Sequence, residues 1–383
     1  MTDKIQIVYL QGDGVAQDIW NASHEALEEA VIRAYNGEKR IEWIRLIAGI
    51  EALEKQGRLL PEETISEIRE RKVAIKGPLT TPVGGGFRSI NVYLRQIFDL
   101  YVCLRPVRYF EGLPSPLKKP HRVDFVILRE NTEDLYKGIE WEAGTDEVME
   151  IINFLRERTE TPIPDDSGIG IKPISRDNTR RFVRWAIEYA LKNRRRVITV
   201  VHKGNIMKYT EGAFRKWAYE LAEEYMDRLS FRENGEKIIF NDRIADNMFM
   251  QAILRPEEYD VLVCPNLNGD YLSDACAALI GGLGVAPGAN IGDEIAIFEP
   301  THGSAPKYAG KDMVNPASFL LSGGMMLAHV GLDEASRLLT AAIEATVREG
   351  VMTYDLARQI DGVIPVSCSV FGNEVTKRIG KTQ

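Results

Sequence analysis

Short apolar runs alternate with longer amphipathic stretches along this 383-residue chain, and this alternation restricts its fold more than any other feature. Short continuous apolar runs are typical of buried strands, whereas apolar residues that recur about every 3.6 residues are typical of helices. Four strand–helix pairs stand out, at residues 5–10 with 17–35, 73–75 with 90–100, 197–201 with 211–225, and 261–264 with 271–280. The alternation predicts an α/β protein with a largely parallel sheet.

One region interrupts this rhythm. Residues 141–174 contain the stretch TPIPDDSGIGIKP, which is rich in proline, glycine and aspartate. Such composition is typical of loops and turns. We therefore expect loops or short strands that project from the body, in an insertion used for subunit contact.

Charge and cysteine content exclude several classes of protein. The formal net charge of -8 would repel nucleic acid and anionic membranes, so we expect neither as a partner. The N-terminal residues include Asp3 and Lys4 and form no sustained apolar run, which predicts a cytoplasmic location without a signal peptide. The four cysteines form no C-x-x-C pair, and we expect buried, reduced thiols.

Arginines gather in residues 76–108. Ser89 stands where a helix N-cap would, and Asn91 and Arg95 lie four residues apart on one helical face. Arg95 and Arg105 interrupt apolar sequence, where an unpaired guanidinium would be costly. A polycarboxylate ligand could neutralise several arginines, Arg129 included, through bidentate hydrogen bonds. For any single arginine, a solvated surface position remains an alternative.

Two acidic residues, Asp270 and Asp274, are four residues apart and project from one face of a predicted helix. A divalent cation with a preference for oxygen, Mg²⁺ or Mn²⁺, would relieve their repulsion. Asp246 is a possible third ligand. The alternative is a pair of acids stabilised by the helix dipole.

Lys203 and Asn205 directly follow an apolar strand, where site residues of open α/β sheets usually lie. Lys203 is therefore a catalytic candidate, although a surface lysine fits the same position. Tyr136 is equally ambiguous, because tyrosines are common in cores and at their rims.

Residues 286–316 are rich in loops and predict a nucleotide site. Gly303 can adopt a positive φ, and His302, Lys307 and Tyr308 are placed to meet a nucleotide. The segment lacks the G-x-G-x-x-G pattern of Rossmann folds and lies late in the chain. A cofactor bound here would therefore not be held by a Rossmann-type glycine-rich loop.

Together, these segments resemble the isocitrate/isopropylmalate dehydrogenase family along nearly the whole chain, and within it the prokaryotic NADP-dependent isocitrate dehydrogenases. The resemblance implies oxidative decarboxylation of isocitrate to 2-oxoglutarate and CO2, with NADP and Mg²⁺ or Mn²⁺, in the tricarboxylic acid cycle. The Ser89-x-Asn91 pair is similar to the isocitrate version. The alternatives are homoisocitrate, isopropylmalate or tartrate as substrate, or a silent regulatory subunit, which would lack the metal and base residues that this chain retains.

The resemblance also implies an architecture that is not a Rossmann fold. A large domain would comprise residues 1–100 and 281–383, a small α/β domain residues 101–133 and 176–280, and a clasp-like dimerisation segment residues 134–175. The active unit would be a homodimer with shared sites, in which the neighbouring subunit donates Lys203, Asn205 and Asp246.

Residue roles follow from the same resemblance. Three carboxylates of isocitrate would be held by Ser89, Asn91, Arg95, Arg105 and Arg129. Acid–base work would fall to Tyr136 and Lys203 with Asp270, and metal binding to Asp246, Asp270 and Asp274. The cofactor would contact Thr80, Asn205, Glu299, His302, Gly303, Lys307, Tyr308, Val314, Asn315, Tyr354 and Arg358. Lys307, Tyr308, Tyr354 and Arg358 would surround the 2′-phosphate of NADP.

Overall fold

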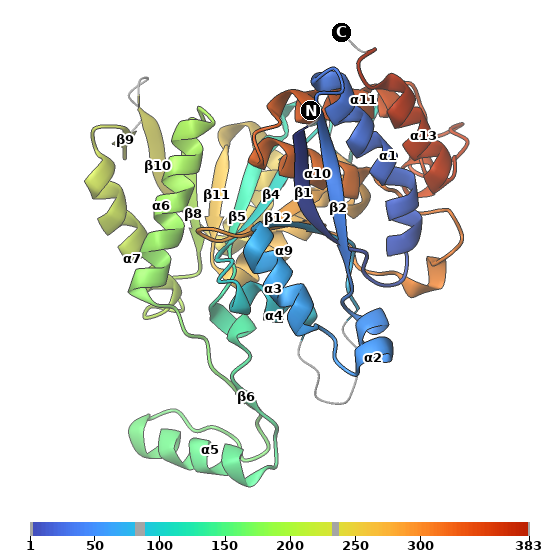
Figure 1. The fold of residues 1–383 in the computed structure, drawn as a ribbon. Helices are drawn as coiled ribbons and strands as arrows, with labels where there is room; N and C mark the ends of the chain where they lie inside the picture. The colour runs from blue at the N-terminus through green and yellow to red at the C-terminus, as the bar shows by residue number, and fades with distance from the viewer. Residues whose placement is uncertain (1–2, 81–88, 232–236, 382–383) are drawn as a thin grey trace.

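A single eleven-stranded sheet runs through the protein, whose computed structural model describes residues 3–80, 89–231 and 237–381 (Figure 1). The strand order is β2-β1-β3-β13-β12-β4-β5-β11-β8-β10-β9. The strands are β1 Asp3–Leu10, β2 Lys39–Leu46, β3 Val73–Lys76, β4 Val102–Arg108, β5 Asp124–Glu130, β8 Val197–His202, β9 Leu229–Ser230, β10 Ile238–Ile244, β11 Val261–Cys264, β12 Pro287–Ile291 and β13 Ala296–Pro300.

The sheet is parallel except around β4 and β12. β12 runs antiparallel to both β13 and β4, and β4 runs antiparallel to β5. The expectation of a largely parallel sheet is confirmed. β3 and β11 are buried along their whole lengths, because helices cover both faces of the sheet, and such strands read as continuous apolar runs.

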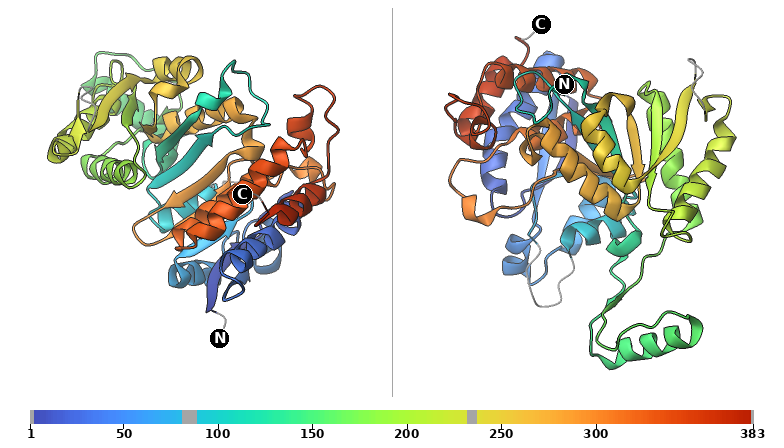
Figure 2. Two further views of the ribbon diagram at one scale, coloured as in Figure 1. Left: turned by 90° about the horizontal axis from the view of Figure 1, so that it is seen from above. Right: turned by 180° about the vertical axis from the view of Figure 1, so that it is seen from behind.

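Helices flank this sheet in two groups (Figures 1 and 2). α1, α10, α11 and α13 pack against one another beside the strands from the chain ends, whereas α6 and α7 pack beside β8. The helices are α1 Ala16–Ala34, α2 Ile50–Gln56, α3 Glu62–Arg71, α4 Ile90–Ile97, α5 Asp146–Arg158, α6 Arg176–Lys192, α7 Glu211–Ala222, α8 Ala245–Leu254, α9 Asn266–Ala277, α10 Ala317–His329, α11 Asp333–Arg348, α12 Tyr354–Ala357 and α13 Cys368–Arg378.

The segment between residues 139 and 171 projects away from the body (Figure 1). It contains a two-stranded sheet, β6 Glu140–Trp141 with β7 Ile169–Gly170, and the helix α5. The expectation of only loops or short strands was wrong. Thr145 caps α5 by accepting a hydrogen bond from the Val148 amide at 3.3 Å. The side chains of Val148 and Ile152 are buried on one face of the helix. The proline- and glycine-rich stretch occupies only the connection that follows α5.

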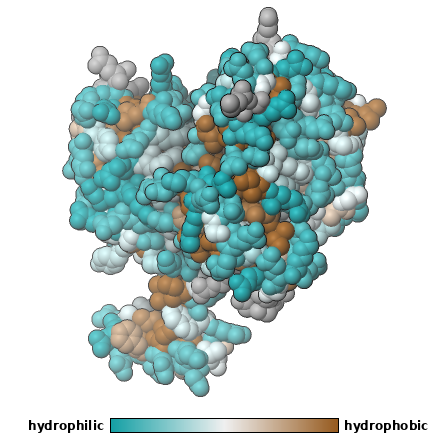
Figure 3. All heavy atoms as spheres, in the orientation of Figure 1, coloured by the Kyte–Doolittle hydropathy of each residue, from teal (hydrophilic) through white to brown (hydrophobic). Residues whose placement is uncertain are grey.

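Helix α9 begins at Asn266, earlier than the expected residue 271, because Pro265 can precede a helix but not continue one. Asp270 and Asp274 therefore both lie inside α9. Each of the four cysteines is buried and free, as expected. In the part of the chain that the structure describes, no helix is long and apolar enough to cross a membrane. The visible surface is mostly hydrophilic, and apolar residues gather in its central hollow and on the projecting segment (Figure 3).

Candidate active site

The carboxyl ends of three neighbouring parallel strands bring the predicted site residues to one edge of the sheet. β5, β11 and β8 pair side by side in parallel. Arg129 lies near the end of β5, Lys203 follows β8, and α9, which carries Asp270, begins just after β11. Ligands of open α/β sheets bind at this edge.

Arg129, Tyr136 and Asp270 form the centre of this site. The Arg129 guanidinium is 1% exposed, donates from Nε to Asn266 Oδ1 at 2.8 Å and pairs with the Asp270 carboxylate. The Tyr136 hydroxyl donates to the other Asp270 oxygen, and its ring lies 4.5 Å from the Arg129 guanidinium carbon. Tyr136 belongs to the short 3-10 turn η2, Asp134–Lys137. These contacts connect three separate elements.

Charges within this cluster set its protonation. Burial raises the pKa of Asp270, but the Arg129 charge and the Tyr136 hydrogen bond outweigh burial, and the net shift is downward. Burial and the contact with Asp270 raise the pKa of the Tyr136 hydroxyl. Near neutral pH, Asp270 is therefore a carboxylate and Tyr136 retains its proton.

Arg105, on β4, reaches the same helix one turn further along. Its Nη1 donates to Ser273 Oγ at 2.7 Å and to Asp274 Oδ1 at 3.1 Å. Burial raises the pKa of Asp274, and Arg105 partly opposes this shift. The two carboxylates of α9 thus each contact a buried arginine.

Helix α4 supplies the remaining predicted substrate residues. Ser89 caps the helix, because its Oγ accepts from the Val92 amide at 3.5 Å. Asn91 Oδ1, Arg95 Nε and Arg129 Nη2 are buried polar atoms that have no hydrogen-bond partner among the described residues. Buried polar groups in native proteins are usually paired, and guanidinium groups suit carboxylates. The Arg95 and Arg129 donors therefore fit an anionic ligand, whereas Asn91 Oδ1 can accept a hydrogen bond only from a donor such as a hydroxyl group.

Glu299 joins Arg95 to a lysine that the sequence analysis did not single out. Its carboxylate contacts Lys76, lies 3.5 Å from Arg95 Nη2 and accepts from Asn290 Nδ2 at 2.6 Å. Burial raises the pKa of Glu299, but the charges of Lys76 and Arg95 outweigh burial and lower the pKa to about 2. Lys76 ends the apolar strand VAIK, and a cation in such a run was the available signal.

Lys203 and Asp246 form a separate pair, with 2.7 Å between Lys203 Nζ and Asp246 Oδ1. Asn205 is exposed in the same loop. Within residues 3–80, 89–231 and 237–381, no three acidic, histidine or cysteine side chains form a group able to hold a metal. One chain thus brings Asp270 and Asp274 together but leaves Asp246 with Lys203.

The predicted nucleotide residues line a cavity of about 410 Å³. Its walls include six of them, namely His302, Gly303, Tyr308, Val314, Asn315 and Tyr354. The rings of Tyr308 and Tyr354 lie 5.8 Å apart. Lys307 Nζ lies 4.8 Å from the Tyr308 ring, and the Arg358 guanidinium carbon lies 5.9 Å from the Tyr354 ring. The two cations therefore flank a pair of aromatic rings.

Thr80 lies near this cavity, and His302 is one of its lining residues. The Thr80 hydroxyl donates to Ser304 Oγ at 2.6 Å, and its amide donates to Asp13 Oδ2 at 2.7 Å. Burial lowers the pKa of His302, whose Nε2 is buried without a partner among the described residues. Gly303 does not use the positive φ that glycine allows, whereas Ala305, two residues later, has a φ of 37°.

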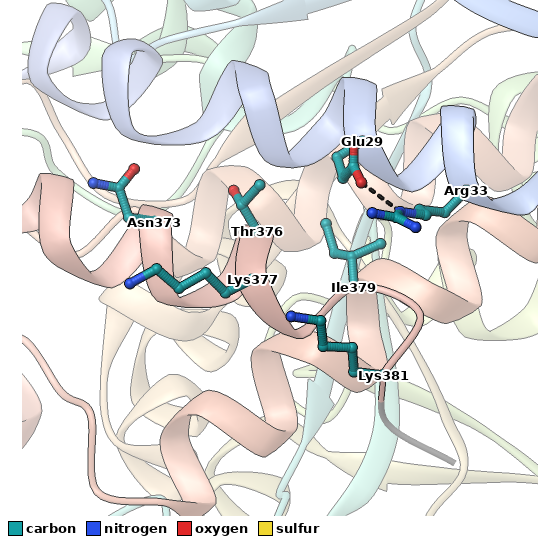
Figure 4. Close-up of a pocket in the computed structure, with 7 residues that line it drawn as sticks. All are labelled: Glu29, Arg33, Asn373, Thr376, Lys377, Ile379 and Lys381. Carbon is teal, nitrogen blue, oxygen red and sulfur yellow. Dashed lines mark hydrogen bonds and ion pairs between the residues drawn. The ribbon is translucent and has the colours of Figure 1, made fainter. Parts of the chain in front are cut away.

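A further cavity of about 370 Å³ lies between α1 and the C-terminal part of α13 (Figure 4). It is lined by Glu29, Arg33, Asn373, Thr376, Lys377, Ile379 and Lys381. None of the predicted site residues lines this cavity.

Comparison with known proteins identifies the family. Residues 6–375 match the family described as isocitrate/isopropylmalate dehydrogenase. The chain belongs to this family. The isocitrate dehydrogenase [NADP] of Staphylococcus epidermidis is 51% identical over 401 residues, which cover 97% of this chain and 95% of the relative. The enzyme of the same name from Archaeoglobus fulgidus is 51% identical, with 93% of this chain and 88% of the relative covered.

Solved structures agree with this assignment. The crystal structure of isocitrate dehydrogenase from Methylococcus capsulatus superposes with a TM-score of 0.83 at 38% identity and covers 99% of both chains. A protein from Thermus thermophilus gives a TM-score of 0.83 at 36% identity, with 98% of this chain and 68% of that chain covered. The expected isocitrate/isopropylmalate dehydrogenase-like fold is confirmed.

Sequence reasoning missed several residues that the isocitrate/isopropylmalate dehydrogenase fold brings to the site. Asn266 holds Arg129, and Asn290 holds Glu299. Asp355 accepts from Asn315 at 3.1 Å in the nucleotide cavity, which Val15 and Gly284 also line. Nothing in the local sequence distinguishes these residues, because their role depends on partners that are distant along the chain.

Proposed function

We propose that this protein is an NADP-dependent isocitrate dehydrogenase, which oxidises isocitrate and decarboxylates it to 2-oxoglutarate and CO2 through oxalosuccinate. The observation that carries the proposal is the set of buried arginines at the edge of the sheet. Arg95 Nε and Arg129 Nη2 are buried and unpaired among the described residues, beside the acidic face of α9. Such a site matches a ligand that carries several carboxylates.

In this proposal, five residues hold the substrate: Ser89, Asn91, Arg95, Arg105 and Arg129. Asp270 and Asp274, with Asp246, would hold Mg²⁺ or Mn²⁺, for which carboxylate oxygens are suitable ligands. When bound, the ion makes the substrate hydroxyl more acidic and stabilises the enolate that follows loss of CO2.

The acid–base steps fall to side chains of the protein. Lys203, assisted by Asp270, removes the hydroxyl proton while hydride passes from the substrate carbon to the nicotinamide. Tyr136 then donates a proton to the carbon that has lost CO2. The hydrogen bond from the Tyr136 hydroxyl to Asp270 supports this role, because it places the proton donor beside the proposed metal ligands.

For NADP, we propose the contact residues Thr80, Asn205, Glu299, His302, Gly303, Lys307, Tyr308, Val314, Asn315, Tyr354 and Arg358. Lys307 and Arg358 would bind the 2′-phosphate with the two tyrosine hydroxyls. The phosphate dianion of NADP interacts favourably with these two cations, whereas the free ribose hydroxyl of NAD would donate a hydrogen bond to a carboxylate.

We further propose a homodimer in which the clasp-like segment 134–175 joins two copies and Lys203, Asn205 and Asp246 act in the partner's site. The large domain would comprise residues 1–100 and 281–383, and the small domain residues 101–133 and 176–280. Exposed apolar side chains support the dimer: Leu254 on α8 is 65% exposed and Phe154 on α5 is 58% exposed. A cytoplasmic enzyme without nucleic acid or membrane partners suits the net charge of -8.

The initial rate of reduced-nicotinamide formation tests the function. We expect activity with isocitrate and Mg²⁺, strong preference for NADP over NAD, and loss of activity with a chelator. Isopropylmalate and homoisocitrate are the matched alternatives. Higher activity with either of them would retain the family but overturn the assignment of Ser89 and Asn91 to isocitrate.

A further inference from the structure

A partly buried cation, Lys172, contacts two carboxylates at the base of the projecting segment. Lys172 Nζ lies 2.7 Å from Asp134 Oδ1 and 2.8 Å from Glu211 Oε1. The side chains of Asp134 and Glu211 are 1% and 0% exposed, and that of Lys172 is 14% exposed. Asp134 and Lys172 flank the projecting segment on its two sides, and Glu211 is the first residue of α7.

Each carboxylate holds the backbone of an element that carries a proposed catalytic residue. Asp134 Oδ2 accepts from the Leu267 amide at 2.9 Å, at the start of the helix that carries Asp270. Asp134 is also the first residue of η2, which carries Tyr136. One side chain therefore fixes the relative position of two proposed catalytic elements.

Glu211 extends the same network to the third element. Its Oε2 accepts from the backbone amide of Lys203 at 2.5 Å and from Asn268 Nδ2 at 2.8 Å. Asn268 lies on α9, close to Asp270. The Glu211 carboxylate thus connects the Lys203 loop directly to α9.

The lysine charge is needed for this arrangement. Burial lowers the pKa of Lys172, but its contacts with Asp134 and Glu211 raise it by more, so the cation persists above neutral pH. Without it, two almost fully buried carboxylates would keep their neutral donors but lose the only cation that the structure shows in contact with both, which is unfavourable. The two carboxylates would then repel each other, and we expect the elements that they hold to move apart.

We propose that Lys172 is a positioning residue for catalysis, which holds the Lys203 loop, η2 and α9 in register through Asp134 and Glu211. The inference rests on the proposed function, because that function assigns the roles of Lys203, Tyr136 and Asp270. In the proposed homodimer, Lys203 acts in the partner's site, so Lys172 also links the two sites to the base of the clasp-like segment.

The test compares Lys172→Met, Lys172→Arg and the control Lys216→Met, an exposed lysine on α7. Lys172→Met is expected to lower kcat about tenfold or more and to change the KM for isocitrate less than about threefold, because a misplaced base affects the chemical step. Lys172→Arg keeps the cation and is expected to restore kcat to within about threefold of the unmodified enzyme. Lys216→Met is expected to match the unmodified enzyme.

A second readout is independent of activity. Mass spectrometry can follow the rate at which an amine-reactive reagent labels Lys203. This rate is expected to rise in Lys172→Met and to stay unchanged in Lys172→Arg. If the unmodified protein lacks isocitrate activity, the proposed function fails, yet this labelling still tests the network.

The inference would be overturned if Lys172→Met had the kcat and the Lys203 labelling rate of the unmodified enzyme. A lower kcat with an unchanged labelling rate would also overturn it. If Lys172→Met does not fold, Glu211→Gln replaces it, because that variant removes the ion pair between Lys172 and Glu211, leaves the one with Asp134 and keeps an acceptor for the Lys203 amide. It is expected to change kcat and labelling in the same direction, and wild-type values in Glu211→Gln would also contradict the proposal.

Discussion

The Tyr136 hydroxyl donates a hydrogen bond to the Asp270 carboxylate, so the proposed proton donor and a proposed metal ligand are in direct contact within one chain. The Arg129 guanidinium lies over the Tyr136 ring and pairs with the same carboxylate. Substrate binding, metal binding and proton transfer therefore depend on one cluster. Substitutions in it should affect different kinetic constants according to the role of each side chain.

Tyr136→Phe is expected to impair decarboxylation more than oxidation, because only the step after CO2 loss needs the hydroxyl proton. Oxalosuccinate supplied directly to the enzyme isolates that half-reaction. Removal of a positioned acid typically costs about 10²- to 10⁴-fold in rate. An equal loss in both half-reactions would assign Tyr136 a structural role.

Arg129→Lys tests substrate binding. Lysine keeps the charge but loses the fork geometry that contacts Asn266 and Asp270 together. We expect the KM for isocitrate to rise about 10- to 100-fold, which corresponds to one or two lost charged hydrogen bonds. Arg108→Lys is the control, because Arg108 lies on β4 and pairs with Glu344, outside the site. A comparable rise in both variants would refute a specific role for Arg129.

Lys307→Asp is expected to reverse the cofactor preference. The new carboxylate repels the 2′-phosphate and can accept from the free ribose hydroxyl of NAD. We expect kcat/KM for NADP to fall about 100-fold or more, which is the size expected for reversing one charge contact. Lys55→Asp, at a surface ion pair with Glu51, controls for the change of charge. Unchanged discrimination between NADP and NAD would place the phosphate site elsewhere.

Asp242 provides a test of stability. It accepts hydrogen bonds from His202 Nε2 at 3.0 Å and Tyr219 at 2.7 Å, and it pairs with Arg215 at 2.8 Å. Burial raises the pKa of Asp242, but these three partners outweigh burial and hold the pKa well below its usual range. Asp242→Asn should therefore lower the free energy of unfolding at pH 7 by about 1.5–3 kcal/mol.

The pH dependence of this effect has a defined sign. In the unfolded chain the carboxyl of Asp242 titrates near pH 3.9, roughly the value of model peptides. The stabilisation is complete above that pH and is lost as pH falls through the lower pKa of the folded state. Thermal unfolding midpoints of the unmodified protein and Asp242→Asn should converge on acidification below about pH 4. A difference that stays constant to the lowest pH would contradict the pKa assignment.

Local patterns predicted those parts of the fold that depend on neighbouring residues. The spacing of Asp270 and Asp274 placed both on one helix, and the apolar run before Lys203 placed that residue at a strand end. The buried contacts were not predictable, because Lys76 meets Glu299, and Lys172 meets Asp134 and Glu211, only through the tertiary fold. Helix α5 was missed because the loop composition that follows it dominated the region.

Complementation between inactive variants tests the proposed shared site most directly. Tyr136→Phe and Lys203→Met are each expected to show little steady-state NADP reduction with isocitrate, because the first variant cannot complete turnover after oxidation and the second lacks the base for oxidation itself. In a mixed dimer, one site would carry both substitutions and the other neither, so unfolding and refolding the two variants together should restore up to about a quarter of the wild-type rate by random pairing. Each variant refolded alone is the control. Recovery of activity is the result that we expect, and a mixture no more active than its components would contradict a site built from two subunits.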